Sequence, residues 1–483
     1  MVEGWKGGMV ERWKGGRVER VERVIEEALE KATDTKACVI GAGATEGAAK
    51  MFREMFPGAK RAIVVSDPRT RRVAGARVVE LLKSSGVEVS EHVICPDGSW
   101  FHATYDKVEE VREAILSCNQ AISNQTIKQS NNQTIPIAVG SGTVNDLVKR
   151  GSEEAGVRYM VVGTAASMDG YTSFGAAITK DGMKQTLACK APLGCIVDSA
   201  VAAAAPKEMT ASGYADLIAK IPAGADWMLA DAIGSEAIHP DAWRFVQDPL
   251  RDSLSNPSGC AAGDEREVRK LCEGLVMSGF AMQAMNSSRP ASGTEHQVSH
   301  YWDMEDLAFE GRPVSHGFKV GIGTLVSTKT LEFLLEQDLA NLDVEAAVAR
   351  WWPTFGGAAG TFAAVYGGRP AHIRRAETEF AKKYVSPDGL RKELAAFKAN
   401  WPELSARLRA QLMPFDEVRE NLKTVGAPYE PEMIGVSRAR FRETYAGVPF
   451  MRARYFGLDL VQRLGLMSEL QNRLFGKGGV WEV

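Results

Sequence analysis

The chain has 483 residues and a formal net charge of −3, with 45% hydrophobic and 25% charged residues. This composition is typical of a globular protein of about two to four domains, and it excludes a broad basic surface for nucleic acid. The chain shows no apolar run of the ~20 residues that a membrane-spanning helix needs and no apolar signal core at its start. With seven irregularly spaced cysteines, which favour free thiols, these features predict a cytoplasmic location.

In chain order, residues 1–30 contain an imperfect Trp-Lys-Gly-Gly repeat, which we interpret as an appended segment outside the core fold. Short apolar runs then alternate with helical stretches. Because strands that alternate with helices usually pair in parallel, residues 31–200 are predicted to form an α/β domain. The predicted strands are residues 36–41, 61–66, 87–94, 135–139 and 158–163.

One stretch interrupts this alternation. Residues 117–134 form a polar tract rich in Asn and Gln, of low complexity. Such a tract buries too little apolar area to offset the entropy lost on ordering it. We therefore predict a disordered surface insert that catalysis does not require.

Beyond about residue 200 the strand signals end and helical spacing continues, so residues 201–483 are predicted to form an all-helical domain. Ligands of open α/β sheets bind beyond the carboxyl ends of the strands. A reacting centre would then lie in the cleft between the two domains.

Two loops of small and hydroxylated residues follow neighbouring predicted strands. The first, Gly140-Ser-Gly-Thr-Val-Asn-Asp146, opens a helix whose N-terminal N–H groups can bind a phosphate. A tight turn capped by Asn145 or Asp146 is the alternative reading. The second loop covers residues 163–173. Two such loops side by side are what a dinucleotide requires.

Asp67 ends the second predicted strand and can accept a hydrogen bond from an adenosine ribose, although Asp before Pro is also a common turn residue. Arg69, Arg71 and Arg72 follow it and could accommodate a 2′-phosphate. The sequence therefore leaves NAD(H) and NADP(H) both open.

Three of the seven histidines, His296, His300 and His316, lie close together in the chain. Imidazole is the commonest metal ligand, and a catalytic metal site adds a third ligand and an open position. Asp216, in Ser-Gly-Tyr-Ala-Asp-Leu-Ile-Ala-Lys, is the best candidate for that ligand. The alternative is that these are scattered surface or satisfied core histidines.

Five motifs, taken in this order, resemble the sn-glycerol-1-phosphate dehydrogenases of the dehydroquinate synthase, glycerol dehydrogenase and iron-containing alcohol dehydrogenase superfamily. They are Gly-Ser-Gly-Thr-Val-Asn-Asp, Thr-Ala-Ala-Ser-Met-Asp-Gly-Tyr-Thr-Ser, Ser-Gly-Tyr-Ala-Asp, Glu-His-x-x-Ser-His and His-Gly-x-x-Val-Gly-x-Gly-Thr. The resemblance runs from about residue 38 to 466, and residues 426–460 are similar to the bacterial branch. Residues 1–30 and 117–134 have no counterpart and fall on no motif.

The resemblance implies a Rossmann-like α/β domain followed by an all-α domain, as in dehydroquinate synthase, with the active site between them. It implies an oxidoreductase that interconverts dihydroxyacetone phosphate and sn-glycerol 1-phosphate with NAD(H) or NADP(H) and one divalent ion, Zn or Ni. The implied metal ligands are Asp216, His296 and His316. The implied cofactor contacts are Asp67, Gly140, Ser141, Gly142, Asn145, Asp146, Thr164, Ala165, Ser167 and Ser173.

Asp169, His300 and Asp216 are the implied substrate contacts, and Asp169 and His300 are the catalytic candidates. His300 follows His296 by one helical turn, so both imidazoles share a helix face. One can hold the metal while the other donates to the substrate or relays a proton. The substrate phosphate needs cationic partners, and the candidates are Lys180, Lys184 and Lys319. The alternative for each of them is a solvated surface lysine.

Other functions fit the same fold. A dehydrogenase of another polyol or sugar phosphate would use the same site, and a nucleotide-binding homologue without catalysis would keep the loops alone. Retention of Asp216, His296 and His316 argues against the second. We also expect a homodimer or larger homo-oligomer with no nucleic-acid partner.

Overall fold

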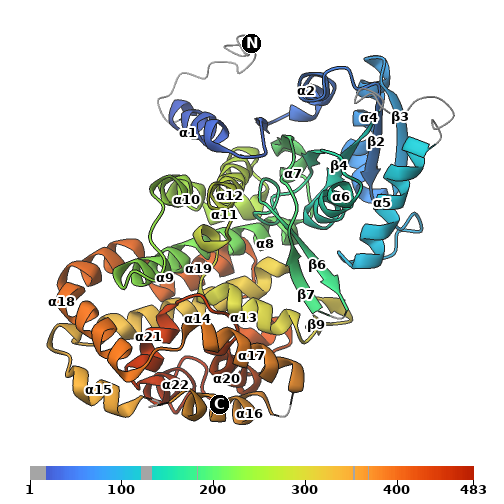
Figure 1. The fold of residues 1–483 in the computed structure, drawn as a ribbon. Helices are drawn as coiled ribbons and strands as arrows, with labels where there is room; N and C mark the ends of the chain where they lie inside the picture. The colour runs from blue at the N-terminus through green and yellow to red at the C-terminus, as the bar shows by residue number, and fades with distance from the viewer. Residues whose placement is uncertain (1–17, 121–132, 182, 352–353, 368) are drawn as a thin grey trace.

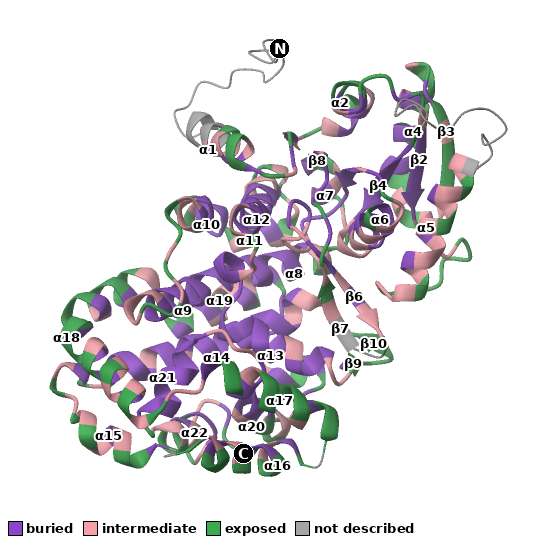
Figure 2. Ribbon diagram, viewed as in Figure 1, coloured by how far each residue is buried: buried purple, intermediate pink, exposed green. Residues whose placement is uncertain are grey.

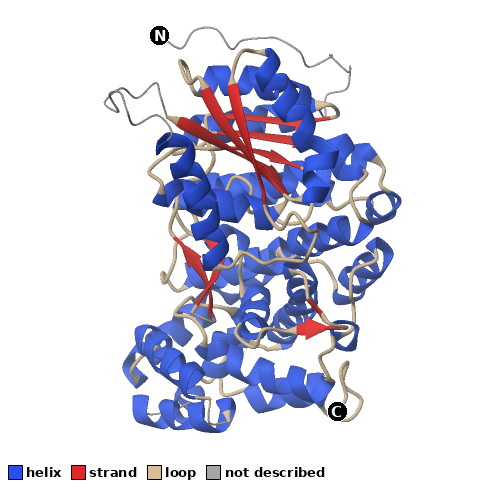
Figure 3. Ribbon diagram, turned by 90° about the vertical axis from the view of Figure 1, so that its right-hand side faces the viewer, coloured by secondary structure: helices blue, strands red, loops and turns tan. Residues whose placement is uncertain are grey.

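The structure is a computed structural model, which describes residues 18–120, 133–181, 183–351, 354–367 and 369–483 (Figure 1). The first part of the chain forms a sheet with helices, and the rest is a larger helical body. Figure 3 shows the sheet at one end of the molecule with the helical body below it. Among the described residues, no helix is both long enough and apolar enough to cross a membrane.

The sheet has six parallel strands in the order β3-β2-β4-β5-β8-β1. The strands are β1 (Ala37–Gly41), β2 (Arg61–Ser66), β3 (Glu88–Val93), β4 (Thr134–Gly140), β5 (Met160–Gly163) and β8 (Gly194–Asp198). All five predicted strands and the α/β class are confirmed. The sixth, β8, was missed, because a five-residue apolar run carries no period that separates strand from helix.

Every residue of the central strands β4, β5 and β8 is buried, as expected for a parallel sheet covered on both faces. Alternate residues of one strand therefore belong to different cores: Val161 packs on one face, and Val162 on the other. The first face is covered by α5 (Tyr105–Gln120) and α6 (Gly142–Glu154), the second by α2 (Ala48–Met55) and α4 (Ala76–Ser84).

A hairpin that the sequence reading did not include follows β5. Its strands, β6 (Ala176–Lys180) and β7 (Met183–Leu187), are antiparallel and extend from the sheet towards the helical body (Figure 1). Ala177, Thr179 and Thr186 line the cleft described below. The hairpin thus forms part of a wall of the cleft.

The helical body is centred on four helices that are mostly buried (Figure 2). These are α8 (Lys207–Ile218), α12 (Glu265–Met285), α13 (Thr294–Asp303) and α14 (His316–Glu336). The surrounding helices are α7 (Ser199–Ala203), α9 (Lys220–Ala232), α10 (Pro240–Ser253), α11 (Pro257–Ala262), α15 (Val344–Arg350), α16 (Phe355–Tyr366), α17 (Pro370–Lys383), α18 (Pro387–Gln411), α19 (Phe415–Val425), α20 (Arg438–Gly447), α21 (Gly457–Arg463) and α22 (Met467–Phe475).

The expectation of a purely helical second half needs one correction. Strands β9 (Ala308–Phe309) and β10 (Arg312–Pro313) form a short antiparallel hairpin. Its two turn residues, Glu310 and Gly311, have φ angles of 51° and 74°. Positive φ at both positions is the geometry of a tight hairpin turn. Strands of two residues each are too short to produce a recognisable pattern in the sequence.

Part of the segment expected outside the core is joined to the fold. Helix α1 (Val18–Lys31) packs on α12 and α10, with Ala28 buried and Glu27 bridging to Arg244 Nη1 at 2.6 Å. Residues 1–17 lie outside the described residues. In the predicted polar insert, residues 117–120 belong to α5, and β4 begins at Thr134; residues 121–132 lie outside the described residues as well.

Candidate active site

A cleft of about 1570 Å³ separates the carboxyl ends of the sheet strands from the helical body. Its upper wall comes from the loops after β2, β4 and β5, and its floor from α8, α13 and α14. This is the position in which open α/β sheets bind their ligands.

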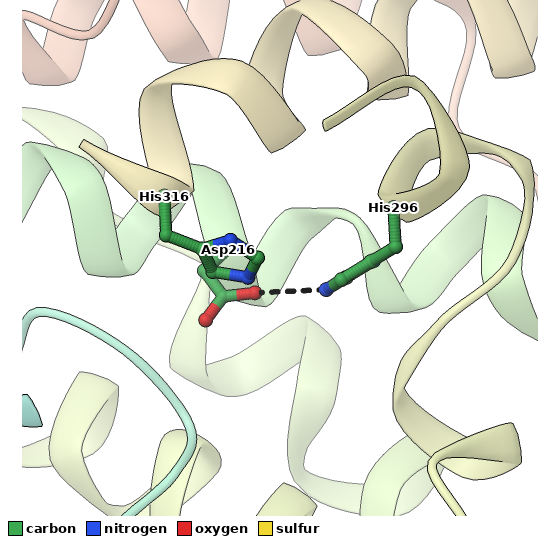
Figure 4. A group of neighbouring side chains, drawn as sticks. All are labelled: Asp216, His296 and His316. Carbon is green, nitrogen blue, oxygen red and sulfur yellow. Dashed lines mark ion pairs between the residues drawn. The ribbon is translucent and has the colours of Figure 1, made fainter. Parts of the chain in front are cut away.

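Asp216, His296 and His316 converge from α8, α13 and the first residue of α14 (Figure 4). The two histidines line the floor of the cleft, and Asp216 is fully buried beside them. One potential ligand atom from each residue lies within 4.8 Å of the others. His296 Nε2 is 3.5 Å from Asp216 Oδ1, and both side chains are buried. Two imidazoles and a carboxylate at this spacing fit a divalent ion of borderline softness.

Two glycines allow these elements to approach so closely. A Cβ on Gly317 would lie 1.9 Å from the Ser212 carbonyl oxygen, where α14 meets α8. A Cβ on Gly213 would lie 2.0 Å from the carbonyl oxygen of Ala166, in the loop after β5. Gly317 follows His316, and Gly213 precedes Asp216 by three positions. Backbone contacts without a side chain therefore set the spacing of α14 against α8 and of α8 against the loop after β5.

Hydrogen bonds orient both imidazoles. Glu295 Oε1 lies 2.8 Å from His296 Nδ1, which leaves Nε2 turned towards Asp216. Ser299 Oγ lies 3.5 Å from His316 Nδ1. An oxygen partner behind each ring selects which nitrogen is available for a metal, as in many metal sites.

Lys220 is a member of the site that the sequence reading quoted but gave no role. Its buried Nζ lies 2.8 Å from Asp216 Oδ1 and 2.9 Å from Asp169 Oδ2. Burial opposes ionisation of Asp216, but Lys220 together with His296 and His316 outweighs it, and the pKa of Asp216 is lowered. The pKa of Lys220 is raised against its own burial by the two carboxylates. The signal was present as the i, i+4 spacing from Asp216 to Lys220 on one helix.

Asp169 and His300 line the cleft beside the three ligands. The Asp169 backbone N–H donates to Asp216 Oδ2 at 3.2 Å, and Ser278 Oγ donates to Asp169 Oδ2 at 2.8 Å. His300 Nδ1 is 3.6 Å from Asp303 Oδ2, so Nε2 is the nitrogen left for a ligand. Desolvation in the cleft lowers the pKa of His300 to about 4, which makes the ring neutral at pH 7.

Most of the predicted cofactor residues share one wall of the cleft. The ones that line it are Asp67, Ser141, Gly142, Asp146, Thr164, Ala165, Ser167 and Ser173. Helix α6 begins at Gly142, with no side-chain cap on its first N–H groups from Ser141. A helix N-terminus of this kind is suited to a pyrophosphate.

Gly140 and Asn145, also predicted to contact the cofactor, do not line the cleft. Asn145 is fully buried: it donates to the Gly170 carbonyl oxygen at 3.2 Å and accepts from Tyr159 Oη at 3.1 Å. Beside it, the buried Nζ of Lys149 donates to three carbonyl oxygens between residues 170 and 175. The polar side of α6 therefore fixes the second loop instead of facing the ligand.

Asp67 combines the two roles considered for it. Its Oδ1 accepts from Arg69 N at 2.7 Å and Thr70 N at 3.0 Å, which caps the short helix α3 (Pro68–Thr70), and the residue also lines the cleft. Arg69 and Arg72 line the cleft too. Arg71 turns away and pairs with Glu91 at 2.7 Å, so it is removed from the candidates for a 2′-phosphate.

The lysines considered for the substrate phosphate are placed differently from one another. Lys180 lies over the Tyr105 ring at 3.8 Å and does not line the cleft. Lys319 lines the cleft but is paired with Asp303. The side chain of Lys184 lies outside the described residues.

Comparisons with known proteins show which family and which fold the chain resembles. The family model for iron-containing alcohol dehydrogenases matches residues 39–206. Structures titled as a probable glycerol dehydrogenase from Sinorhizobium meliloti and a glycerol dehydrogenase from Schizosaccharomyces pombe cover 90% and 92% of the chain and 96% and 92% of their own, with TM-scores of 0.55 and 0.56. At 15% and 14% identity they establish the fold.

Relatives named glycerol-1-phosphate dehydrogenase (NAD(P)+) are closer in sequence. The Geobacillus thermodenitrificans protein is 35% identical over 55% of this chain, and the match spans 62% of that relative, which is less than two thirds of its length. The Bacillus subtilis protein is 31% identical over 66% of this chain and 78% of the relative. The predicted family is thereby confirmed: the chain belongs to the glycerol-1-phosphate dehydrogenases.

Proposed function

We propose that the protein interconverts dihydroxyacetone phosphate and sn-glycerol 1-phosphate, using NAD(H) or NADP(H) and one divalent ion. The observation that carries this proposal is the convergence of Asp216, His296 and His316 on a cleft floor that faces two loops suited to a dinucleotide. A nucleotide-binding protein without catalysis would need no such ligand set.

The residues present fit a metal. Asp216 is held ionised beside Lys220, and the His296 and His316 rings are each oriented by an oxygen partner. Nitrogen and carboxylate donors of this kind suit Zn or Ni, which we propose as the native ion. When bound, the nicotinamide supplies the hydride and the ion, as a Lewis acid, stabilises the charge that develops on the substrate oxygen.

The chain's own groups would orient the substrate and handle the proton. Lys220 couples Asp216 to Asp169, so the ligand and the neighbouring substrate contact are held as one unit. His300 is neutral at pH 7, and its Nε2 can accept the hydroxyl proton as glycerol 1-phosphate is oxidised; reduction reverses the path.

The direct test is turnover of dihydroxyacetone phosphate by purified protein with NADH or NADPH, after metal removal and after reconstitution with Zn²⁺ or Ni²⁺. The proposal expects cofactor oxidation only with metal, and a product of the sn-1 configuration in an enantiospecific assay. If the protein turned over another polyol or sugar phosphate faster than dihydroxyacetone phosphate, the alternative dehydrogenase function would be supported instead.

We expect His300→Ala to reduce kcat/KM by about 10²-fold while metal content and cofactor affinity stay unchanged, because His300 faces the cleft without being a ligand. Metal analysis beside steady-state kinetics separates the roles. Loss of metal would make His300 part of the metal site, and near-normal turnover would remove it from the reaction.

Gly142→Val should raise the cofactor dissociation constant about tenfold or more, because a side chain at the first turn of α6 would fill the space next to Met168, whose Cγ lies 2.9 Å from the Cβ position. Fluorescence titration with NADH measures the change. Gly41→Val is the matched control, since its Cβ position is open and Gly41 does not line the cleft. Equal affinity in both variants would place the pyrophosphate elsewhere.

We further propose a cytoplasmic homo-oligomer. Its seven cysteines are all free in the structure, which suits a reducing compartment. Light scattering of the full chain would give the oligomeric state.

A further inference from the structure

Three arginines gather at the metal end of the cleft. Arg289 lies in the turn before α13, and Arg452 and Arg454 lie in the segment before α21. Arg452 and Arg454 both donate to the hydroxyl of Ser288, the residue before Arg289. Of the three, only Arg452 lines the cleft.

Arg289 and Arg454 are engaged by the protein itself. Arg289 is fully buried and donates to the Tyr455 and Asp226 carbonyl oxygens at 3.0 and 2.7 Å. Arg454 donates to Ser292 Oγ at 2.8 Å and to the Ser292 carbonyl oxygen at 3.1 Å. Both also share one carboxylate, Glu236, at 3.4 and 3.9 Å. Their donors are thus directed into the fold.

Arg452 is different. It is half-buried, and its hydrogen bond to Ser288 Oγ is long, at 3.4 Å. Within the part of the chain that the structure describes, no carboxylate oxygen lies within 4.0 Å of its guanidinium. A guanidinium stays charged at any ordinary pH and carries five N–H donors in a fixed fork. Such a group, partly desolvated and in contact with no carboxylate among the described residues, favours binding an anion from the cleft.

The position of Arg452 fits a phosphate attached to the reacting molecule. It lies close enough to His300 to contribute to the lowered pKa of that ring, and the two residues line the same cleft. His300 in turn follows the metal ligand His296 by one turn of α13. A three-carbon substrate with its carbonyl at the metal site would therefore present its far end to the arginine cluster.

We propose that Arg452, with the Ser288 hydroxyl, binds the substrate phosphate and selects phosphorylated over unphosphorylated three-carbon substrates. The identity of the substrate rests on the function proposed above, whereas the anion site rests on the arginine geometry alone. The fork of Arg452 can donate two parallel hydrogen bonds to phosphate oxygens. This assignment replaces the lysines: Lys319 is paired with Asp303, and Lys180 lies outside the cleft.

The test compares Arg452→Gln with wild type on dihydroxyacetone phosphate and on dihydroxyacetone, in the metal-loaded protein. We expect kcat/KM for the phosphorylated substrate to fall by about 30-fold or more, mainly through KM, while the value for dihydroxyacetone stays within a few-fold. Arg452→Lys should recover part of the loss because it keeps the charge but not the fork.

Arg375→Gln is the matched control. Arg375 donates to the Met451 carbonyl oxygen at 3.2 Å and contributes positive charge near Arg452, but it does not line the cleft. The control should leave the preference for the phosphorylated substrate unchanged. Thermal midpoints and metal content of all variants identify a folding defect. If Arg452→Gln shows one, Arg452→Lys is compared with wild type in its place.

A binding measurement separates this inference from the proposed function. Calorimetric titration with sn-glycerol 1-phosphate and with inorganic phosphate should show binding to wild type and its loss in Arg452→Gln, whether or not turnover is seen. Loss of binding without any wild-type turnover would overturn the function and support the site. An equal drop in kcat/KM for both substrates, or unchanged phosphate binding, would overturn the assignment of Arg452.

Discussion

Replacing His316 with Ala is expected to remove the bound metal and to lower turnover by about 10³-fold or more. His316 is one of the three proposed donors, whose ligand atoms all lie within 4.8 Å of one another. The remaining pair of Asp216 and His296 would be too few to bind a catalytic ion tightly. Metal content by mass spectrometry and kcat/KM on the same preparation measure both effects.

The matched control is His92→Ala. His92 lies on the edge strand β3, pairs with Glu110 and does not line the cleft. It should keep full metal content and activity. Retention of one tightly bound ion in His316→Ala, with turnover near that of wild type, would refute the ligand set.

Gly317→Ala should destabilise the protein by about 3 kcal/mol and weaken metal binding at the same time. The new Cβ would lie 1.9 Å from the Ser212 carbonyl oxygen, a backbone atom that no rotamer change can move. Helices α14 and α8 would have to separate. Because His316 precedes this glycine and Asp216 follows Ser212 by one turn, the separation would pull two ligands apart.

Gly360→Ala provides the comparison for that prediction. Gly360 lies inside α16 with open space around its Cβ position, so alanine there should raise the stability by about 0.5–1 kcal/mol. Denaturant unfolding and metal titration of both variants give the two quantities. If Gly317→Ala matched Gly360→Ala in either one, the close contact would not be what positions the ligands.

The sequence by itself determined the class of fold and the three residues predicted to form the metal site. Apolar runs in residues 36–163 alternate with helical stretches, and this pattern indicates a parallel sheet because each intervening helix returns the chain and covers a face of the sheet. Asp216, His296 and His316 were found because each sits in its own short motif. The structure brings all three together as the motifs implied.

Tertiary structure decided which polar residues of a motif face the ligand. Asn145 and Ser141 are four positions apart in one motif, yet Asn145 is directed into the core, where it bonds Gly170 and Tyr159, while Ser141 lines the cleft. A motif records residue types and spacing, but the partner that satisfies a buried amide comes from another part of the chain.

Only the tertiary structure assigned the charged groups. Lys220 pairs with two carboxylates, one of which, Asp169, lies 51 positions away in the chain. Arg452 lines the cleft although it lies more than a hundred residues beyond the proposed metal ligands. Charges act through space, and burial decides which of them must find a partner. That decision depends on packing between distant helices, and no local pattern in the sequence contains it.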